Sequence, residues 1–230
     1  MSESPDAPSV LPDPPVAPTK PHTWQRPTGP VDDPYAWLRN REDPDTIAYL
    51  EAENTYSGAF FEQHAELVES LFEEIKSRVQ ETDQSVPVQH GPWWYITRTI
   101  EGQSYPVFCR GAAIESASDG VILDCNVEAE GHDFFDIHAV DPSPDHTLLA
   151  WSADVDGGER YTLRVRDLET GTDLPDELTD TSSWGGLAWS SDGQSLFYAR
   201  PDERYYLDVS STRSVYRSPP STSADQARRV

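Results

Sequence analysis

The stretch that decides the fold is SPDHTLLAWSADVDGGERYTLRVRDLETG, residues 143–171. Turn residues open it, close it and divide it at DVDGGE, and the runs between them alternate apolar and polar side chains. A period of two is typical of β-strands with one buried face, and a short Gly-containing link predicts a hairpin. The acidic residues of the link also suggest a calcium loop, but Asp154, Asp156 and Glu159 do not have the spacing of an EF-hand. We therefore predict a turn at DVDGGE.

The same pattern returns later in the chain. DPSPDHTLLAWSAD (141–154) is echoed by AWSSDGQSLFYARPD (188–202), and Asp192 lies 47 positions after Asp145. A period of about 40–50 residues with four short strands per unit is typical of propeller blades. Further short alternating runs lie between residues 91 and 217 without helical patterns between them, so the sheets are expected to be antiparallel. Residues 84–230 then form an incomplete β-propeller of about three blades.

Two segments of different character precede these strands. Residues 1–30 are rich in proline and poor in large apolar side chains, which predicts a mostly extended arm with a few contacts near Trp24. Residues 31–83 have a helical pattern in which Asp43 caps a helix that begins with Pro44, and Gly58 marks a bend. An apolar stripe at helical spacing follows, formed by Leu67, Leu71, Phe72, Ile75 and Val79.

The composition limits the class of partner and the compartment. The chain carries 41 acidic and 17 basic residues, a formal net charge of −24, which disfavours nucleic acid and anionic membranes as partners. No apolar run reaches the length of a membrane span or a signal peptide, so we expect a soluble cytoplasmic protein. Cys109 and Cys125 are too few for a disulfide framework and are expected to be reduced, partly buried thiols.

Few residues suggest chemistry by themselves. His132 and His138 would face one side of a strand, but a metal site needs further ligands, so both are interpreted as surface or half-buried histidines. A triad of Ser195, His146 and Asp192 has no support in the sequence beyond the residue types. We expect four tryptophans to pack in the core or between blades: Trp93, Trp94, Trp151 and Trp189. Arg204, Tyr205 and Tyr206 are expected to form a strand and its turn.

Several motifs in chain order resemble the prolyl oligopeptidase family of serine peptidases. DDPYAWLRNREDPDTIAYLEAEN (32–54) is similar to its N-terminal signature, and ILDCNVEAEGHDFF (122–135) with the following strands is similar to its early propeller blades. EEIKSRVQETDQSVP (73–87), GPWWYITRTIEGQSYPVFCR (91–110) and SSDGQSLFYAR (190–200) resemble the oligopeptidase B (protease II) branch. The likeness covers about residues 31–216.

The resemblance implies an architecture and an activity. In the family, an N-terminal helical segment leads to a seven-bladed propeller, which covers an α/β-hydrolase domain that carries the catalytic serine, aspartate and histidine. The oligopeptidase B branch is a serine-type endopeptidase group that cleaves short peptides after Arg or Lys without a metal or organic cofactor. The implied partners are therefore short basic peptides and, as a packing partner for the propeller, the hydrolase domain.

The sequence departs from that pattern in length and in its serines. Family members are roughly three times as long, and the nucleophile-elbow pattern G-x-S-x-G is absent, because the serines of Gly102-Gln103-Ser104 and Gly193-Gln194-Ser195 lack the second glycine. We expect no catalytic, cofactor-binding or metal-binding residue in the chain. The first hypothesis is an N-terminal portion of an oligopeptidase B-like peptidase, shortened by truncation or frameshift and inactive alone. The alternative is a stand-alone propeller-like interaction module.

Overall fold

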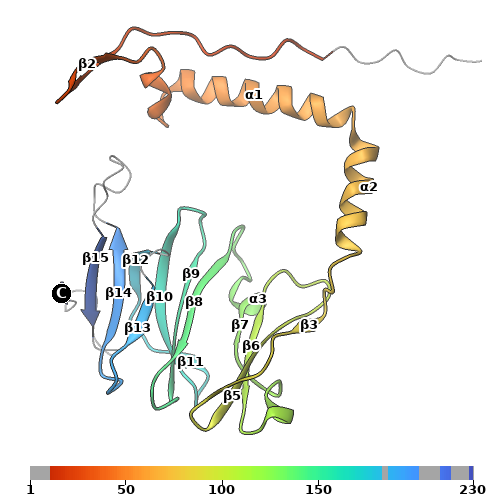
Figure 1. The fold of residues 1–230 in the computed structure, drawn as a ribbon, viewed down its shortest axis with the longest axis vertical. Coiled ribbons are helices and arrows are strands. Elements are labelled where there is room, and N and C mark those ends of the chain that lie inside the picture. Colours follow the sequence, from red (N-terminus) through yellow and green to blue (C-terminus); the bar gives the residue numbers. More distant parts are fainter. Residues whose placement is uncertain (1–10, 183–185, 202–212, 219–227, 230) are drawn as a thin grey trace, which may run out of the picture. The chain divides into compact units, whose positions relative to one another are not determined.

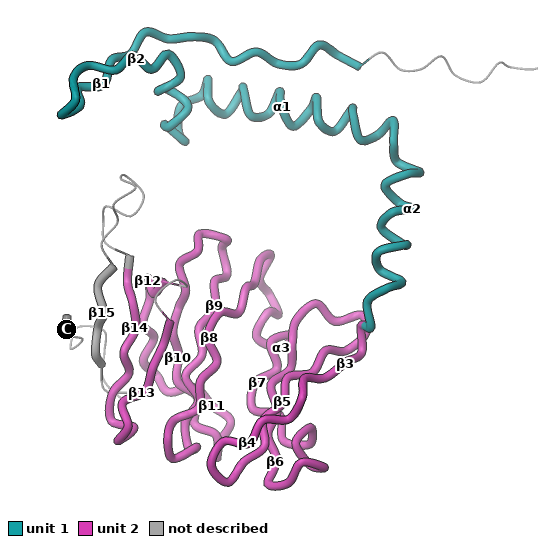
Figure 2. The backbone as a smooth tube through the Cα atoms, in the orientation of Figure 1, with its two compact units in different colours: residues 1–80 teal, residues 81–230 magenta. Residues whose placement is uncertain are grey.

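The computed structural model describes residues 11–182, 186–201, 213–218 and 228–229. The chain divides into two compact units, residues 1–80 and residues 81–230 (Figure 2). We describe each unit by itself.

The first unit combines a short hairpin with two helices (Figure 1). Antiparallel strands β1 (Thr23–Arg26) and β2 (Gly29–Asp32) are followed by a 3-10 helix, Ala36–Arg39. Helix α1 then spans Pro44–Glu62 and helix α2 spans Ala65–Lys76. Residues 11–22 have no regular structure, and at the hairpin the Trp24 indole N–H donates to the Asp33 carboxylate at 3.0 Å.

Helix α1 begins where the sequence predicts. The Asp43 carboxylate accepts a hydrogen bond from the Asp45 amide at 2.9 Å, and Pro44 occupies the first turn, where a missing N–H leaves no bond unmade. The expected bend at Gly58 is wrong, because α1 continues through it to Glu62. The chain changes direction after α1, at residues 63–64, instead.

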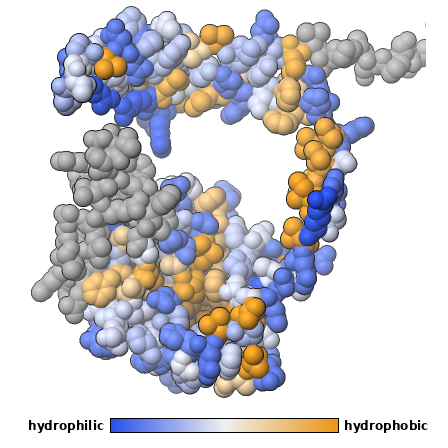
Figure 3. All heavy atoms as spheres, viewed as in Figure 1, coloured by the Kyte–Doolittle hydropathy of each residue, from blue (hydrophilic) through white to orange (hydrophobic). Residues whose placement is uncertain are grey.

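Helix α2 carries an apolar stripe that no other described residue of its own unit covers. Leu67, Leu71, Phe72 and Ile75 are between 47% and 64% exposed, and the apolar spheres along α2 are visible in Figure 3. α1 likewise exposes Leu50 at 53%. The amphipathic pattern expected from the sequence is therefore present, but its apolar side faces solvent.

The second unit contains three antiparallel sheets in its described residues. Sheet 1 has the strand order β3–β5–β6–β7, with β4 also paired to β5. Sheet 2 has the order β8–β9–β10–β11, with β12 also paired to β10, and sheet 3 has the order β13–β14–β15–β16.

The bounds of sheet 1 are β3 Asp83–Gln84, β4 Val88–His90, β5 Trp93–Thr99, β6 Val107–Gly111 and β7 Gly120–Asp124. Those of sheet 2 are β8 Asp136–Pro142, β9 Leu148–Asp154, β10 Arg160–Asp167, β11 Thr172–Asp173 and β12 Leu178–Ser182. Those of sheet 3 are β13 Leu187–Trp189, β14 Leu196–Pro201, β15 Arg213–Ser218 and β16 Arg228–Arg229.

The three sheets follow one another as blades of an incomplete propeller (Figure 1). In each, consecutive strands pair as hairpins, which confirms the antiparallel arrangement expected from the period of two. The expectation that no helix lies between the strands is wrong in detail. A short α3, Cys125–Glu128, connects sheet 1 to sheet 2, and a 3-10 turn, Ile114–Ser116, lies between β6 and β7.

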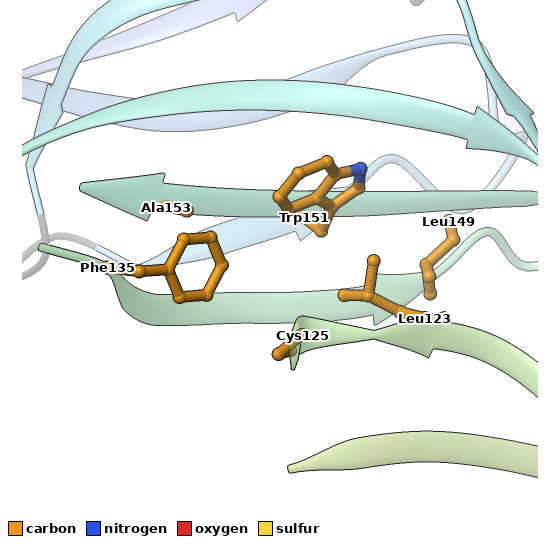
Figure 4. Close-up of a cluster of buried hydrophobic side chains, with 6 residues drawn as sticks. All are labelled: Leu123, Cys125, Phe135, Leu149, Trp151 and Ala153. Atoms are coloured by element: carbon orange, nitrogen blue, oxygen red, sulfur yellow. The ribbon is translucent and has the colours of Figure 1, made fainter. Parts of the chain in front are cut away.

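Two apolar layers join the sheets. The layer between sheets 1 and 2 is shown in Figure 4, and the layer between sheets 2 and 3 is formed mainly by β9, β10, β12 and β14. The buried members of the first layer are Leu123, Cys125, Phe135, Leu149, Trp151 and Ala153. Those of the second are Ala150, Leu163, Val165, Leu178, Leu196 and Tyr198. Because β9 alternates its side chains between both layers, sheet 2 is buried on both faces.

An ion-pair network supports the first layer. Arg166, only 12% exposed, donates to Asp173 at 2.8 and 3.2 Å and to Glu128 of α3 at 2.9 Å. Trp151 completes this corner, since its indole N–H donates to Asp173 at 3.2 Å. The guanidinium thus holds α3, the helix that follows sheet 1, against sheet 2.

Candidate functional site

A hollow in the second unit lies between sheets 1 and 2. It encloses about 500 Å³ and draws its walls from β4, β5, β6, β7, β8 and β9. Its apolar wall is formed by Val88, Ile96, Phe108, Cys109, Ile122, Val140, Pro142 and Leu149, and its polar groups come from Ser85, Gln89, His90, Tyr95 and Thr97. A mostly apolar cavity with a few polar groups is the usual form of a ligand pocket. We call the contact between sheets 1 and 2 the seam.

Two of the pocket residues contact His146, which lies in the turn between β8 and β9. The Tyr95 hydroxyl and His146 Nδ1 are 2.8 Å apart, and the His90 ring meets the His146 ring edge-on with centroids 4.8 Å apart. Arg110 Nη1 donates to the His146 carbonyl at 2.6 Å, and its guanidinium lies 4.3 Å above the Trp93 ring. Strands β4, β5 and β6 of sheet 1 therefore all meet this one turn of sheet 2.

The turn itself is built by its sequence and is repeated in the next sheet. Ser143 Oγ donates to Asp145 at 2.6 Å and accepts from the Leu148 amide at 2.9 Å. In sheet 3, Ser190 Oγ donates to Asp192 at 2.6 Å and accepts from the Ser195 amide at 2.9 Å. The two turns thus match bond for bond at the 47-residue repeat.

The repeat also shows what is unusual about His146. Its φ of 61° is in the left-handed region, which glycine adopts far more readily than other residues, and Gly193 holds the equivalent place in sheet 3 with φ of 68°. The His146 side chain reaches the tight turn of sheet 1 at Gly91, where a Cβ would stand only 2.3 Å from His146 Nε2. Histidine at position 146 and glycine at position 91 are therefore matched across the seam.

Burial and neighbouring charges disfavour a proton on His146. The side chain is almost fully buried, and its pKa is lowered first by that burial and then by His90 and Arg110, while Asp145 opposes the shift. Burial also raises the pKa of the Tyr95 hydroxyl and of the Asp141 carboxyl on β8. The ring is consequently held neutral near pH 7.

The serine, histidine and aspartate of the imagined triad belong to two different turns. Ser195 is 2% exposed and lies at the start of β14, and Asp192 accepts bonds from Ser190 and the Gln194 amide. His146 directs Nδ1 to Tyr95. Asp192 is used in its own turn and the His146 ring in the contact with sheet 1, and the expectation that the chain holds no catalytic residue remains a prediction.

DVDGGE is a hairpin turn, as predicted. It links β9 to β10, and the Asp154 carboxylate accepts bonds from the amides of Asp156, Gly157 and Glu159 at 2.8 to 3.1 Å. These bonds lower the pKa of Asp154 against the opposing effect of burial. Since the carboxylate oxygens face backbone N–H groups, their role in this turn is structural.

The histidines and tryptophans singled out in the sequence have ordinary surroundings. His132 and His138 are exposed, and the His138 ring packs on Tyr161 with centroids 5.2 Å apart. Within the described residues, no three His, Cys, Asp or Glu side chains gather in a way that could hold a metal ion. Trp151 lies in the core as expected, and Trp189 joins sheet 3 to sheet 2 through a 3.0 Å bond to the Asp141 carbonyl. Arg204, Tyr205 and Tyr206 lie outside the described residues.

The thiols and the seam cluster complete the comparison with the sequence. Cys109 and Cys125 are free, as predicted, and fully buried, which raises the pKa of both and that of Cys125 to about 12. The cluster around His146 was not predicted, because its members are separated by up to 56 positions in the chain. The available signal was the repeat itself, which aligns His146 with Gly193.

Comparisons with known proteins agree on one family. Residues 15–228 match the family described as "Prolyl oligopeptidase, N-terminal beta-propeller domain". The chain is 34% identical to "Dipeptidyl aminopeptidase BI" of Pseudoxanthomonas mexicana over 92% of its length and 31% of that protein. It is 32% identical to "Protease 2" of Moraxella lacunata, over 82% of this chain and 28% of the relative.

Solved structures extend the likeness to the fold. Oligopeptidase B from Leishmania major superposes with a TM-score of 0.82 and 30% identity, over 94% of this chain and 32% of that one. Oligopeptidase B from Trypanosoma brucei gives a TM-score of 0.79 at 27% identity. The chain spans roughly a third of the length of these relatives. Among the described helices, none has both the length and the apolar character needed to cross a bilayer.

Proposed function

Because the chain belongs to the prolyl oligopeptidase family, with residues 15–228 in its N-terminal β-propeller domain, we propose that it is the gate of an oligopeptidase B-like serine endopeptidase that cleaves short peptides after Arg or Lys. The superposition on oligopeptidase B across 94% of the chain carries the proposal. The net charge of −24 supports a basic substrate, because an acidic gate raises the local concentration of cationic peptides.

The chemistry belongs to a hydrolase domain in this proposal. A serine there attacks the peptide carbonyl, a histidine transfers the proton, and backbone amides stabilise the oxyanion. The 230 residues contain no G-x-S-x-G elbow, and Ser195 is buried in a turn. A polypeptide of these residues alone should therefore turn over no peptide.

The apolar stripe of α2 is the surface proposed to contact the hydrolase domain. Leu67, Leu71, Phe72 and Ile75 are large apolar side chains that are about half exposed, which is uncommon for a contiguous patch without a partner. The same stripe supports the second candidate, a stand-alone module that binds a separately encoded protein. In either case the stripe is an interface.

The test compares two polypeptides: residues 1–230, and the product of the whole reading frame that contains them. Fluorogenic endopeptidase substrates with Arg, Lys or Pro before the reporter, and an Ala-Ala reporter for dipeptide release, would be assayed with each. We expect cleavage after Arg and Lys by the longer product only, abolished by diisopropyl fluorophosphate. Release of dipeptides instead would replace the proposed specificity by that named for the Pseudoxanthomonas relative. Turnover by residues 1–230 would refute the assignment of the chemistry to another domain, and a reading frame without a hydrolase domain would favour the interaction module.

A further inference from the structure

The seam between sheets 1 and 2 is incompletely packed. The cavity of about 500 Å³ lies beside the apolar layer of Leu123, Leu149 and Trp151 rather than being filled by it. Empty space removes contacts that would otherwise resist separation of two surfaces. We call the part of the seam at β4, β5, β8 and β9 the inner part. Because it borders this cavity, it should open at a lower cost in free energy than a fully packed contact would.

The inner part is instead held by the His146 turn. His146 is a non-glycine residue in the left-handed region, so its backbone is strained. Such strain persists only where contacts of the side chain hold the residue in place. The His146 ring is used in this way, because it meets Tyr95, His90 and Gly91 of sheet 1 at once. Sheet 3 makes the same turn with Gly193 and has no ring at this place.

The groups that face the ring are predominantly cationic or neutral. From sheet 1 they are His90 on β4, Tyr95 on β5 and Arg110 on β6. From its own turn there is Asp145, which is exposed and already accepts bonds from Ser143 and Thr147. Asp141 on β8 acts on His90. A proton on His146 would thus stand in a buried place beside Arg110 and His90.

We propose that the seam is a pH-sensitive joint, in which protonation of His146 separates the inner edges of sheets 1 and 2. When the edges separate, the ring reaches water and the guanidinium of Arg110 no longer lies beside it. The protonated ring is therefore favoured in the open form and the neutral ring in the closed form.

The direction of the pH effect follows from the shifted pKa. The pKa of His146 is lowered in the closed form, whereas in the open form it approaches the ordinary value of about 6.5. The open form therefore binds more protons as the pH falls below that value. The closed form is therefore fully favoured above about pH 6.5. Below that pH, closure is lost progressively as the pH falls toward the lowered pKa of the closed form. The total change in the opening equilibrium is about tenfold for each unit by which the pKa values of the open and closed forms differ.

The test is hydrogen exchange of the full chain between pH 7.5 and pH 5.5, corrected for the intrinsic pH dependence of amide exchange. Peptides covering residues 88–96 and 146–150 report the inner seam, and peptides covering the DVDGGE turn serve as the internal reference. We expect protection of the inner seam to fall on acidification relative to the reference. In His146→Asn, which tolerates the left-handed region but does not titrate, that fall should disappear.

Two further variants keep the test decisive. His90→Asn removes a neighbour that lowers the pKa of His146, so that pKa, followed by NMR of the ring, should rise and the acid-induced loss of protection should shrink. His138→Asn, an exposed histidine on β8, should leave the response unchanged. The proposal is overturned if seam protection in the original chain falls no more than the reference, or falls equally in His146→Asn. If His146→Asn does not fold, an unchanged response in His90→Asn would overturn it.

Discussion

Substituting Gly91 by alanine should destabilise the chain by more than its local conformation explains. Gly91 has φ of 58°, where an alanine is disfavoured by about 1–2 kcal/mol. In addition, the new Cβ would stand 2.3 Å from His146 Nε2, so the ring must move. Forcing the ring off its rotamer costs about 0.5–1.5 kcal/mol. Losing its bond to Tyr95 costs about 0.5–1.5 kcal/mol more. The expected loss is therefore about 2–5 kcal/mol.

Gly171 provides a matched control. Its φ is 70°, but no atom lies within 4 Å of the place its Cβ would take, so Gly171→Ala should lose only the conformational part, about 1–2 kcal/mol. Urea unfolding at pH 7.5, followed by tryptophan fluorescence, measures both variants. The difference between the two free energies of unfolding isolates the close approach across the seam.

A double-mutant cycle gives the refuting outcome. In the His146→Gly background the ring is absent, so adding Gly91→Ala should cost no more than Gly171→Ala. The coupling between positions 91 and 146 should be about 1–3 kcal/mol. Equal losses for the two glycine variants, or additive losses in the cycle, would show that the contact of Gly91 with His146 does not support the fold.

Two other predictions use buried groups. Arg166→Ala should lower the free energy of unfolding by about 2 kcal/mol, because it leaves two mostly buried carboxylates without their cationic partner. Arg164→Ala, whose partner carboxylate is 54% exposed, should lower it by under about 1 kcal/mol in the same urea assay. Iodoacetamide at pH 8 should leave Cys109 and Cys125 unmodified in the folded chain and alkylate both in urea, since burial raises the pKa of each thiol, that of Cys125 to about 12; rapid alkylation of the folded chain, seen by mass spectrometry, would contradict the burial.

The parts of the fold with a local cause could be predicted from the sequence. The residues GVILD form β7 as expected, and the Asp43–Pro44 pair begins α1, because side-chain alternation and capping act within a few residues. The expected bend at Gly58 was wrong because one glycine weakens a helix without ending it. The strands β3, β11 and β16 are only two residues long, too short to show a period.

The seam cluster could not be predicted because it depends on how two sheets meet. His90, Tyr95, Arg110 and His146 come from four separate elements, and no local pattern predicts that they converge. The exposure of the stripe on α2 likewise depends on which surface the helix packs against, which its local pattern does not specify. Both features are determined by tertiary contacts.

The Ser–Asp corner of sheets 2 and 3 has a consequence for how such a chain can grow. A gene segment that runs from Ser143 to the residue before Ser190 starts and stops at the same hydrogen-bonded corner. Duplicating or exchanging that segment would leave every bond of the corner intact, so blades can be added without designing a new connection. The exception is position 146, because its imidazole contacts Gly91 and Tyr95 of sheet 1, so a corner with this histidine suits a blade that follows sheet 1.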